Sequence, residues 1–153
     1  MNILFKLQEK IRTELQSNVL INQVTYGDLF EVDLQKQSSF PMAHVGMQGA
    51  TVSSESGVSV VNISILFLDM VDITKEDEVD HFYGNDNEHY VINNMYSAAL
   101  KTVQELMRGN LYSEGFQLEQ DVNFEFFSER FENKLAGVGI DMQITVKNDF
   151  DLC

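Results

Sequence analysis

The sequence predicts a single α+β domain, with a mainly antiparallel sheet of about five strands and two helices packed on one face. Two kinds of periodicity predict this class. Apolar residues recur every three or four positions in two segments, and they alternate with polar residues in the segments between and after them. The order is helix, three strands, helix, two strands, without the strand-helix-strand repetition of a doubly wound parallel sheet. A chain of 153 residues has room for one such domain, over residues 1–153.

An amphipathic helix is predicted over residues 3–17. Its apolar side chains share one face, at positions 3, 4, 7, 11 and 15, and Lys6, Glu9, Lys10 and Glu14 lie on the other. Because a small domain needs apolar surface for its core, we expect this face to pack on the sheet and not on a partner.

Three strands are expected before the second helix. Alternation with a period of two begins at residues 30–35, and Pro41 suits the start of a second strand at 42–52, where its missing N–H does no harm. Glycines and serines make residues 49–57 a polar turn into the third strand, Val58–Met70. The far end of that strand is apolar on both faces, which is typical of a central, covered strand.

An acidic loop at about 70–86 separates these strands from the long helix. Seven carboxylates fall between positions 69 and 86: Asp69, Asp72, Glu76, Asp77, Glu78, Asp80 and Asp86. Apolar residues then recur at helical spacing and predict a helix over 87–108, with Asp86 as its N-terminal cap and Gly109 as its left-handed stop.

Two strands close the predicted domain. Alternation is clear at 122–126 and clearest at 138–146. Residues 132–137 are expected to form a short connection between these strands, and residues 148–153 a short C-terminal tail.

The charge and cysteine content exclude several classes of function. Ten Lys and Arg against 24 Asp and Glu give a net charge of -14 at pH 7, which repels phosphate backbones and argues against a direct reader of nucleic acid. Cys153 is the only cysteine, so we expect no intrachain disulfide and no multi-cysteine zinc site. No apolar run approaches the ~20 residues of a membrane span, and the first residues lack the apolar core of a signal peptide. We therefore expect a soluble protein made in a reducing cytoplasm.

No catalytic, cofactor-binding or metal-ligating residue is predicted. His81 and His89 share a neighbourhood but lack the His-Glu-x-x-His order, whereas His44 lies in a strand pattern typical of a partly buried, hydrogen-bonded side chain. The acidic loop lacks the order of an EF-hand, so solvated charge is a better explanation than a weak calcium site. Gly137-Val138-Gly139 leads into a strand and not into a phosphate-binding helix. Cys153, close to the chain end, is poorly placed to be held against a base.

Three segments carry a resemblance to a known family. They are Ser39-Phe40-Pro41-x-x-His44-Val45 at the second strand, Asp69-Met70-Val71-Asp72 at the end of the third, and Phe131-Glu132-Asn133-Lys134-Leu135-Ala136-Gly137 before the last. With the order of elements, which covers nearly all of the chain, they resemble the small neck and tail-terminator proteins of tailed bacteriophages, of the lambda type and in phages of Bacteroidetes hosts. The strongly acidic loop departs from that pattern and leaves the layer of the neck or tail open.

The resemblance implies a structural virion protein, made in the bacterial host cytoplasm, that forms a homo-oligomeric ring of typically six or twelve copies. The ring would join head and tail beside neck, portal-side or tail-tube proteins, and DNA would pass through it without specific binding; no membrane, cofactor or catalysis is implied. Free strand edges, loops and termini usually make such contacts. The candidate contact residues lie in the 49–57 hairpin, the 72–86 loop and the tail: Glu55, Ser56, Asp77, Glu78, Phe150 and Leu152.

Two other functions remain open from the sequence. An acidic protein-binding module, such as an inhibitor that mimics DNA, predicts a monomer or dimer with carboxylates on one continuous convex face. A hydrolase that uses some of the 24 carboxylates predicts a concave site, and so many acidic residues single out no particular pair.

Overall fold

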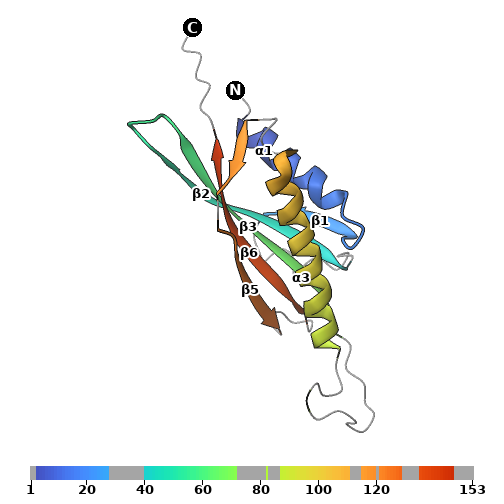
Figure 1. Ribbon diagram of the computed structural model, residues 1–153. Helices are drawn as coiled ribbons and strands as arrows, with labels where there is room; N and C mark the ends of the chain where they lie inside the picture. The colour runs from blue at the N-terminus through green and yellow to red at the C-terminus, as the bar shows by residue number, and fades with distance from the viewer. Residues whose placement is uncertain are drawn as a thin grey trace.

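The computed structural model describes residues 3–27, 40–71, 82, 87–110, 115–119, 121–128 and 135–146 (Figure 1). In chain order the elements are helix α1 (Ile3–Gln16), strands β1 (Gln23–Tyr26), β2 (Met42–Val52) and β3 (Ser59–Met70), helix α3 (Glu88–Glu105), the π-helical turn η1 (Leu106–Asn110), and strands β4 (Phe116–Leu118), β5 (Asn123–Ser128) and β6 (Leu135–Val146).

The strands form one sheet, and the predicted α+β class is confirmed. The order is β1-β2-β3-β6-β4, and β5 pairs with β6 beside β4. Every pair is antiparallel except β1 with β2, which run parallel. The sheet is therefore mixed and has six strands where the sequence predicted about five. The long pairings of β3 with β2 and β6 make β3 a central strand, as its apolar sequence indicates.

Both helices contribute to the core on one face of this sheet. In Figure 1, α3 crosses in front of the sheet with α1 beside it. α1 buries Leu7, Ile11 and Leu15, and α3 packs chiefly on β6 and β3. The buried side chains of both helices belong to one cluster with the alternate residues of the central strands: Val61, Ile63, Ile65 and Phe67 of β3, and Ala136, Val138, Ile140, Met142, Ile144 and Val146 of β6. The apolar stripe of α1 thus packs on its own sheet, as predicted.

Asn18 joins the end of α1 to the middle of α3. Its side chain is buried and donates hydrogen bonds from Nδ2 to the carbonyl of Ala98 (3.1 Å) and to Oγ1 of Thr102 (3.3 Å). Its Oδ1 accepts a bond from the backbone N–H of Leu20. Because a buried amide without such partners would be costly, these bonds fix the position of α1 relative to α3.

The opposite face of the sheet is divided into two parts. At one end, a second buried cluster consists of Met42, Leu68, Phe127 and Leu135. Toward the other end, most side chains on this face are polar, with Val60 as an apolar exception. The polar ones are wholly or partly exposed: Asn62 and Ser64 on β3, Asp141 and Gln143 on β6, and Gln117 on β4. We call this second part, together with Glu119 after β4 and Glu125 of β5, the polar sheet face.

His44 is a hydrogen-bonded strand residue, as predicted, and it is buried more completely than expected. Its side chain is 3% exposed, its Nε2 lies 3.0 Å from the carbonyl oxygen of Gly27, and its Nδ1 lies 2.8 Å from Oγ1 of Thr25. Because a carbonyl oxygen only accepts, Nε2 carries a proton, and in the neutral ring Nδ1 accepts from the Thr25 hydroxyl. His44 therefore ties β2 to the short parallel strand β1.

Replacing His44 by alanine is expected to lower the free energy of unfolding by about 2 kcal/mol, because two hydrogen bonds and a buried ring are lost. Thr25→Val is the matched variant, since it removes only one of the two bonds and should cost about 1 kcal/mol. Urea unfolding followed by circular dichroism measures both variants. Equal stability of His44→Ala and the wild type would show that these bonds do not hold β1.

The ends of α3 differ from the prediction. The N-terminal cap residue is Asn87 instead of Asp86, and its side chain makes no capping hydrogen bond. Gly109 does not stop the helix with a left-handed residue, because α3 continues directly into the π-helical turn Leu106–Asn110. The predicted span of 87–108 is nevertheless close to the observed one.

Several strand boundaries are also corrected. The predicted strand 42–52 is confirmed as β2, so residues 49–52 belong to this strand and not to the turn predicted over 49–57, and β3 begins at Ser59 instead of Val58. Residues 135–137, predicted to be part of a connection, are the first residues of β6. The predicted strand at 30–35, most of the 70–86 loop and the tail at 148–153, including His81 and Cys153, lie outside the described residues.

Candidate assembly surfaces

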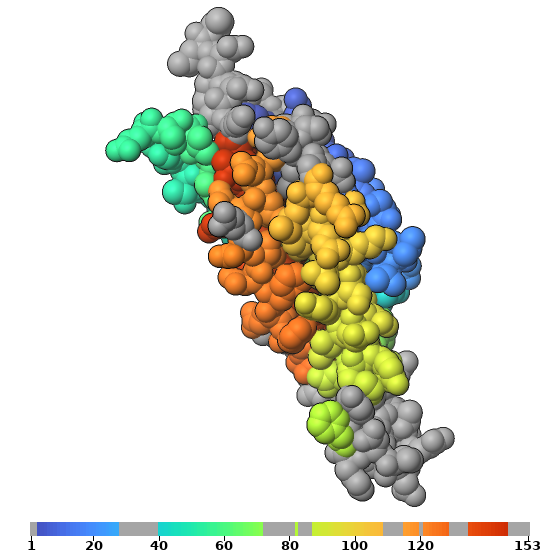
Figure 2. All heavy atoms as spheres, in the orientation of Figure 1, coloured from blue at the N-terminus to red at the C-terminus, as the bar shows by residue number. Residues whose placement is uncertain are grey.

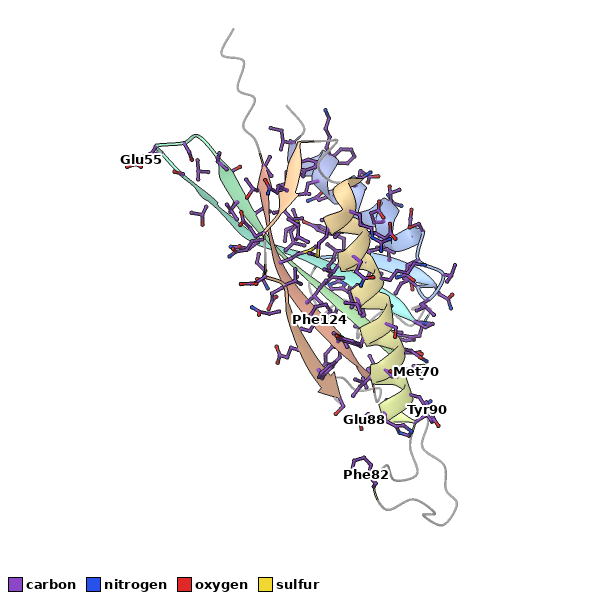
Figure 3. The ribbon with its side chains drawn as sticks, in the orientation of Figure 1. Glu55, Met70, Phe82, Glu88, Tyr90 and Phe124 are labelled. Atoms are coloured by element: carbon purple, nitrogen blue, oxygen red, sulfur yellow. The ribbon has the colours of Figure 1, made fainter. Side chains whose placement is uncertain are left out.

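The β2–β3 hairpin projects from the body of the molecule. Every residue from 48 to 57 is exposed, although residues 48–52 still belong to β2. Figure 2 shows this hairpin as a lobe that stands out at the upper left, and Figure 3 places Glu55 at its tip. We call residues 48–58 the arm. An extended segment that buries none of its own residues offers its surface to another molecule.

Glycines and serines build the arm. Its backbone turns with φ of 153° at Gly49, where the β2–β3 register shifts, and with φ of 67° at Gly57, a value that favours glycine. The turn is closed by hydrogen bonds from the N–H of Ser53 to the carbonyl of Val58 (2.9 Å) and from the N–H of Gly57 to that of Ser53 (3.0 Å). Backbone bonds therefore hold the tip while its side chains stay exposed.

Two of the predicted contact residues lie together in the arm. Glu55 and Ser56 are both exposed at its tip, close to Val52, whose side chain is 64% exposed. The other four predicted contacts lie outside the described residues: Asp77, Glu78, Phe150 and Leu152. Val52 was not predicted as a contact residue, although its position beside the polar turn is consistent with one.

Lys and Arg are unevenly distributed between the helices and the sheet, a feature that was not predicted, although the helices also carry Glu9, Glu14, Glu88 and Glu105. The described strands contain no Lys or Arg. All the described cations lie on the helical elements: Lys6, Lys10, Arg12, Lys101 and Arg108. Comparing the Lys and Arg positions with the predicted elements would have revealed this asymmetry.

Three carboxylates lie along β6 on the polar sheet face. Asp141 is part of β6 itself, and Glu125 of β5 pairs opposite Gly139. Glu119, just after β4, bonds from its backbone N–H to the carbonyl of Gln143, and its side chain accepts a hydrogen bond from the Thr145 hydroxyl. The polar sheet face is therefore anionic along this line.

An aromatic cluster lies at the junction of α3 and the edge strand β5. The Tyr96 ring centroid is 5.4 Å from that of Phe124 and 5.9 Å from that of Phe126. Figure 3 shows Phe124 between the sheet and α3. Phe126 remains 56% exposed. Edge-to-face contacts of this kind add stability beyond the area that they bury, so the cluster holds β5 against the helix.

A groove of about 270 Å³ opens between α1 and β1. Its described lining includes Glu9, Arg12 and Tyr26. Glu9 and Arg12 form an exposed ion pair at 3.4 Å, and Gln8 donates a hydrogen bond to the Tyr26 hydroxyl. Glu9 is the only carboxylate among these described lining residues, so they do not provide the second carboxylate that paired acid-base chemistry uses.

The described residues contain no group of three or more His, Cys, Asp and Glu side chains placed to hold a metal ion. His89 lies in the first turn of α3, with its ring centroid 4.1 Å from that of Tyr90. Among the same residues, no helix is both long enough and apolar enough to span a bilayer.

The sequence matches no protein-family model and no curated protein.

Proposed function

We propose that this protein is the structural subunit of a homo-oligomeric ring at the neck or tail of a tailed bacteriophage. The ring joins head and tail and surrounds the channel through which DNA leaves. The subunit is made in the bacterial host cytoplasm and becomes part of the virion. Neck, portal-side or tail-tube proteins are its neighbours, and six or twelve copies close the ring, as the resemblance in sequence implies.

The projecting arm is the observation that carries this proposal. A monomer gains nothing for its own core from a hairpin that is exposed from residue 48 to 57. Its side chains are mostly small, and Glu55 is its single charged residue, so packing the arm against another subunit requires little charge to be desolvated. In a ring, the arm of each subunit reaches the body of the next.

The edges of the sheet support assembly in the same way. Natural proteins often protect edge strands with lysine or proline. The edge strands β1 and β5 contain neither residue. Such edges are suited to contacts between subunits.

The net charge suits a channel for DNA. Each subunit carries -14, and the described strands carry no cation. Carboxylates near a passing phosphate backbone repel it, so DNA moves without being bound. This reading explains the acidity without assigning any affinity for nucleic acid.

The test is the mass of the purified chain in solution, measured by size-exclusion chromatography with light scattering over a wide range of protein concentration. We expect a discrete species of six or twelve copies that becomes dominant as concentration rises. A chain that stays monomeric or dimeric at every concentration would contradict the ring. If that monomer also bound a DNA-binding protein and displaced its DNA, inhibition by DNA mimicry would replace the ring as the proposed function.

A further inference from the structure

We propose that neighbouring subunits meet front to back, with the flank of α1 that carries Lys6 and Lys10 in one copy on the polar sheet face of the next. Lys6 and Lys10 on α1 are the central cations, and Glu119, Glu125 and Asp141 are the carboxylates that receive them. This inference rests on the proposed ring and names the contact that builds it. The occupant of the polar sheet face is therefore a second copy of this chain.

Charge complementarity is the first argument. Among the described ion pairs, Arg12 pairs with Glu9 at 3.4 Å and Arg108 with Glu105 at 4.0 Å, each within its own helical segment. No described ion pair includes Lys6, Lys10 or Lys101. A chain of charge -14 repels its own copies, so its association is favoured where these cations meet carboxylates.

Lys6 and Lys10 lie on one flank of α1, and Glu14 follows them one turn further along the helix. Lys6 and Lys10 are four residues apart, so they are neighbours on the surface of the helix. Gln8 and Arg12 line the groove beside β1, and helix geometry places Lys6 and Lys10 on the other flank. The buried face of α1 lies between these two flanks; Lys6 is exposed and Lys10 is half-buried.

The polar sheet face is uncovered where the carboxylates lie. Asp141 and Glu125 are exposed, as are Gln143 and Asn123 beside them. The same face is buried at its other end, around Met42 and Leu68, so the exposure is confined to the polar part. Polar, exposed strand residues offer hydrogen bonds to a neighbour in addition to charge.

The two surfaces lie on opposite sides of the sheet, because both helices pack on one face and the three carboxylates follow the other. Lys6 and Lys10 of one subunit therefore lie on the other side of the sheet from its own Glu119 and Asp141. Joining unlike surfaces makes a head-to-tail contact, which closes as a ring if the rotation permits and does not stop at a twofold dimer. The contact therefore has the directionality that the proposed function needs.

Charge reversal in two separate variants tests this contact. One variant carries Lys6→Glu and Lys10→Glu, and the other carries Glu125→Lys and Asp141→Lys. Each alone would oppose like charges across every contact, so we expect the concentration for half assembly to rise by about tenfold or more. An equimolar mixture can alternate the two variants around an even-numbered ring and pairs opposite charges at every contact. We expect the mixture to assemble at a concentration near that of the wild type.

A control separates this contact from general repulsion. Two double variants have the same net charge, -16 instead of -14. The first carries Lys6→Gln and Lys10→Gln, and the second carries Gln16→Glu and Gln104→Glu. Only the first pair should weaken assembly, and thermal unfolding checks that every variant folds. If the wild type forms rings and the reversed variants do so equally well, or their mixture does not recover, the front-to-back contact is overturned while the ring stands. A wild type without rings overturns both.

Discussion

Replacing Gly137 by alanine is expected to lower the free energy of unfolding by about 3 kcal/mol, the largest effect on stability that we expect from one methyl group. A Cβ at this position would lie 1.8 Å from the carbonyl oxygen of Phe67 and 3.0 Å from the Cα of Leu68. Both atoms belong to the backbone of β3, the strand paired with β6 here, so no side-chain rotation relieves the clash. Urea unfolding measures the loss.

Gly139 provides the matched control in the same strand. There, a new Cβ would lie 3.0 Å from Cδ2 of Leu66, the far end of a side chain that can move. We expect Gly139→Ala to cost less than about 1 kcal/mol. If the two variants were equally stable, the close packing of β6 against the β3 backbone at Gly137 would be wrong.

Removing the tip of the arm is expected to abolish the ring while leaving the subunit folded. Val52 and Ser59 are paired across the hairpin, so residues 53–58 can be replaced by Asn-Gly, which favours a tight two-residue turn between paired strands. The loop contributes no buried side chain, so the free energy of unfolding should change by about 0.5 kcal/mol or less. Light scattering should report a monomer at concentrations where the wild type is a ring.

A pair of single substitutions tests the same contact more gently. Val52→Ser should weaken assembly, whereas Tyr90→Ser should not, although both side chains are about equally exposed, at 64% and 65%. Tyr90 lies at the opposite end of the molecule from the tip of the arm (Figure 3). Rings that persist after loss of the tip, with Val52→Ser also without effect, would exclude the arm from the interface.

The sequence predicted the elements whose patterns are long. The helices 3–17 and 87–108 and the strands 42–52 and Val58–Met70 match α1, α3, β2 and β3 closely. α1, α3 and β3 each bury one face along most of their length, and the first four residues of β2 are buried. His44 was also interpreted correctly, because an isolated histidine in an apolar strand needs hydrogen bonds.

Short strands were missed for a physical reason. β1 has four residues and β4 has three, too few to establish a period of two. β1 gains its place from the parallel pairing with β2 and from the bonds between His44, Thr25 and Gly27, which are contacts distant in sequence. The start of β6 was missed because Gly137 weakens strand propensity, yet the close approach to β3 requires glycine there.

The candidate surfaces were predicted only in part. The Gly- and Ser-rich turn located the tip of the arm with Glu55 and Ser56. The polar sheet face was not predicted, because Glu119, Glu125 and Asp141 come from three separate segments that only the pairing of β4 and β5 with β6 brings together. Charge complementarity between two faces is a property of the fold, and spacing along the chain does not contain it.

Electron microscopy of the purified chain at high protein concentration tests the central claim most directly, because it counts copies and shows whether the assembly closes. The account predicts closed rings of six or twelve identical subunits around an open channel, with the arm of each subunit on its neighbour. Particles that are single subunits or twofold dimers, with no ring at any concentration, would contradict it.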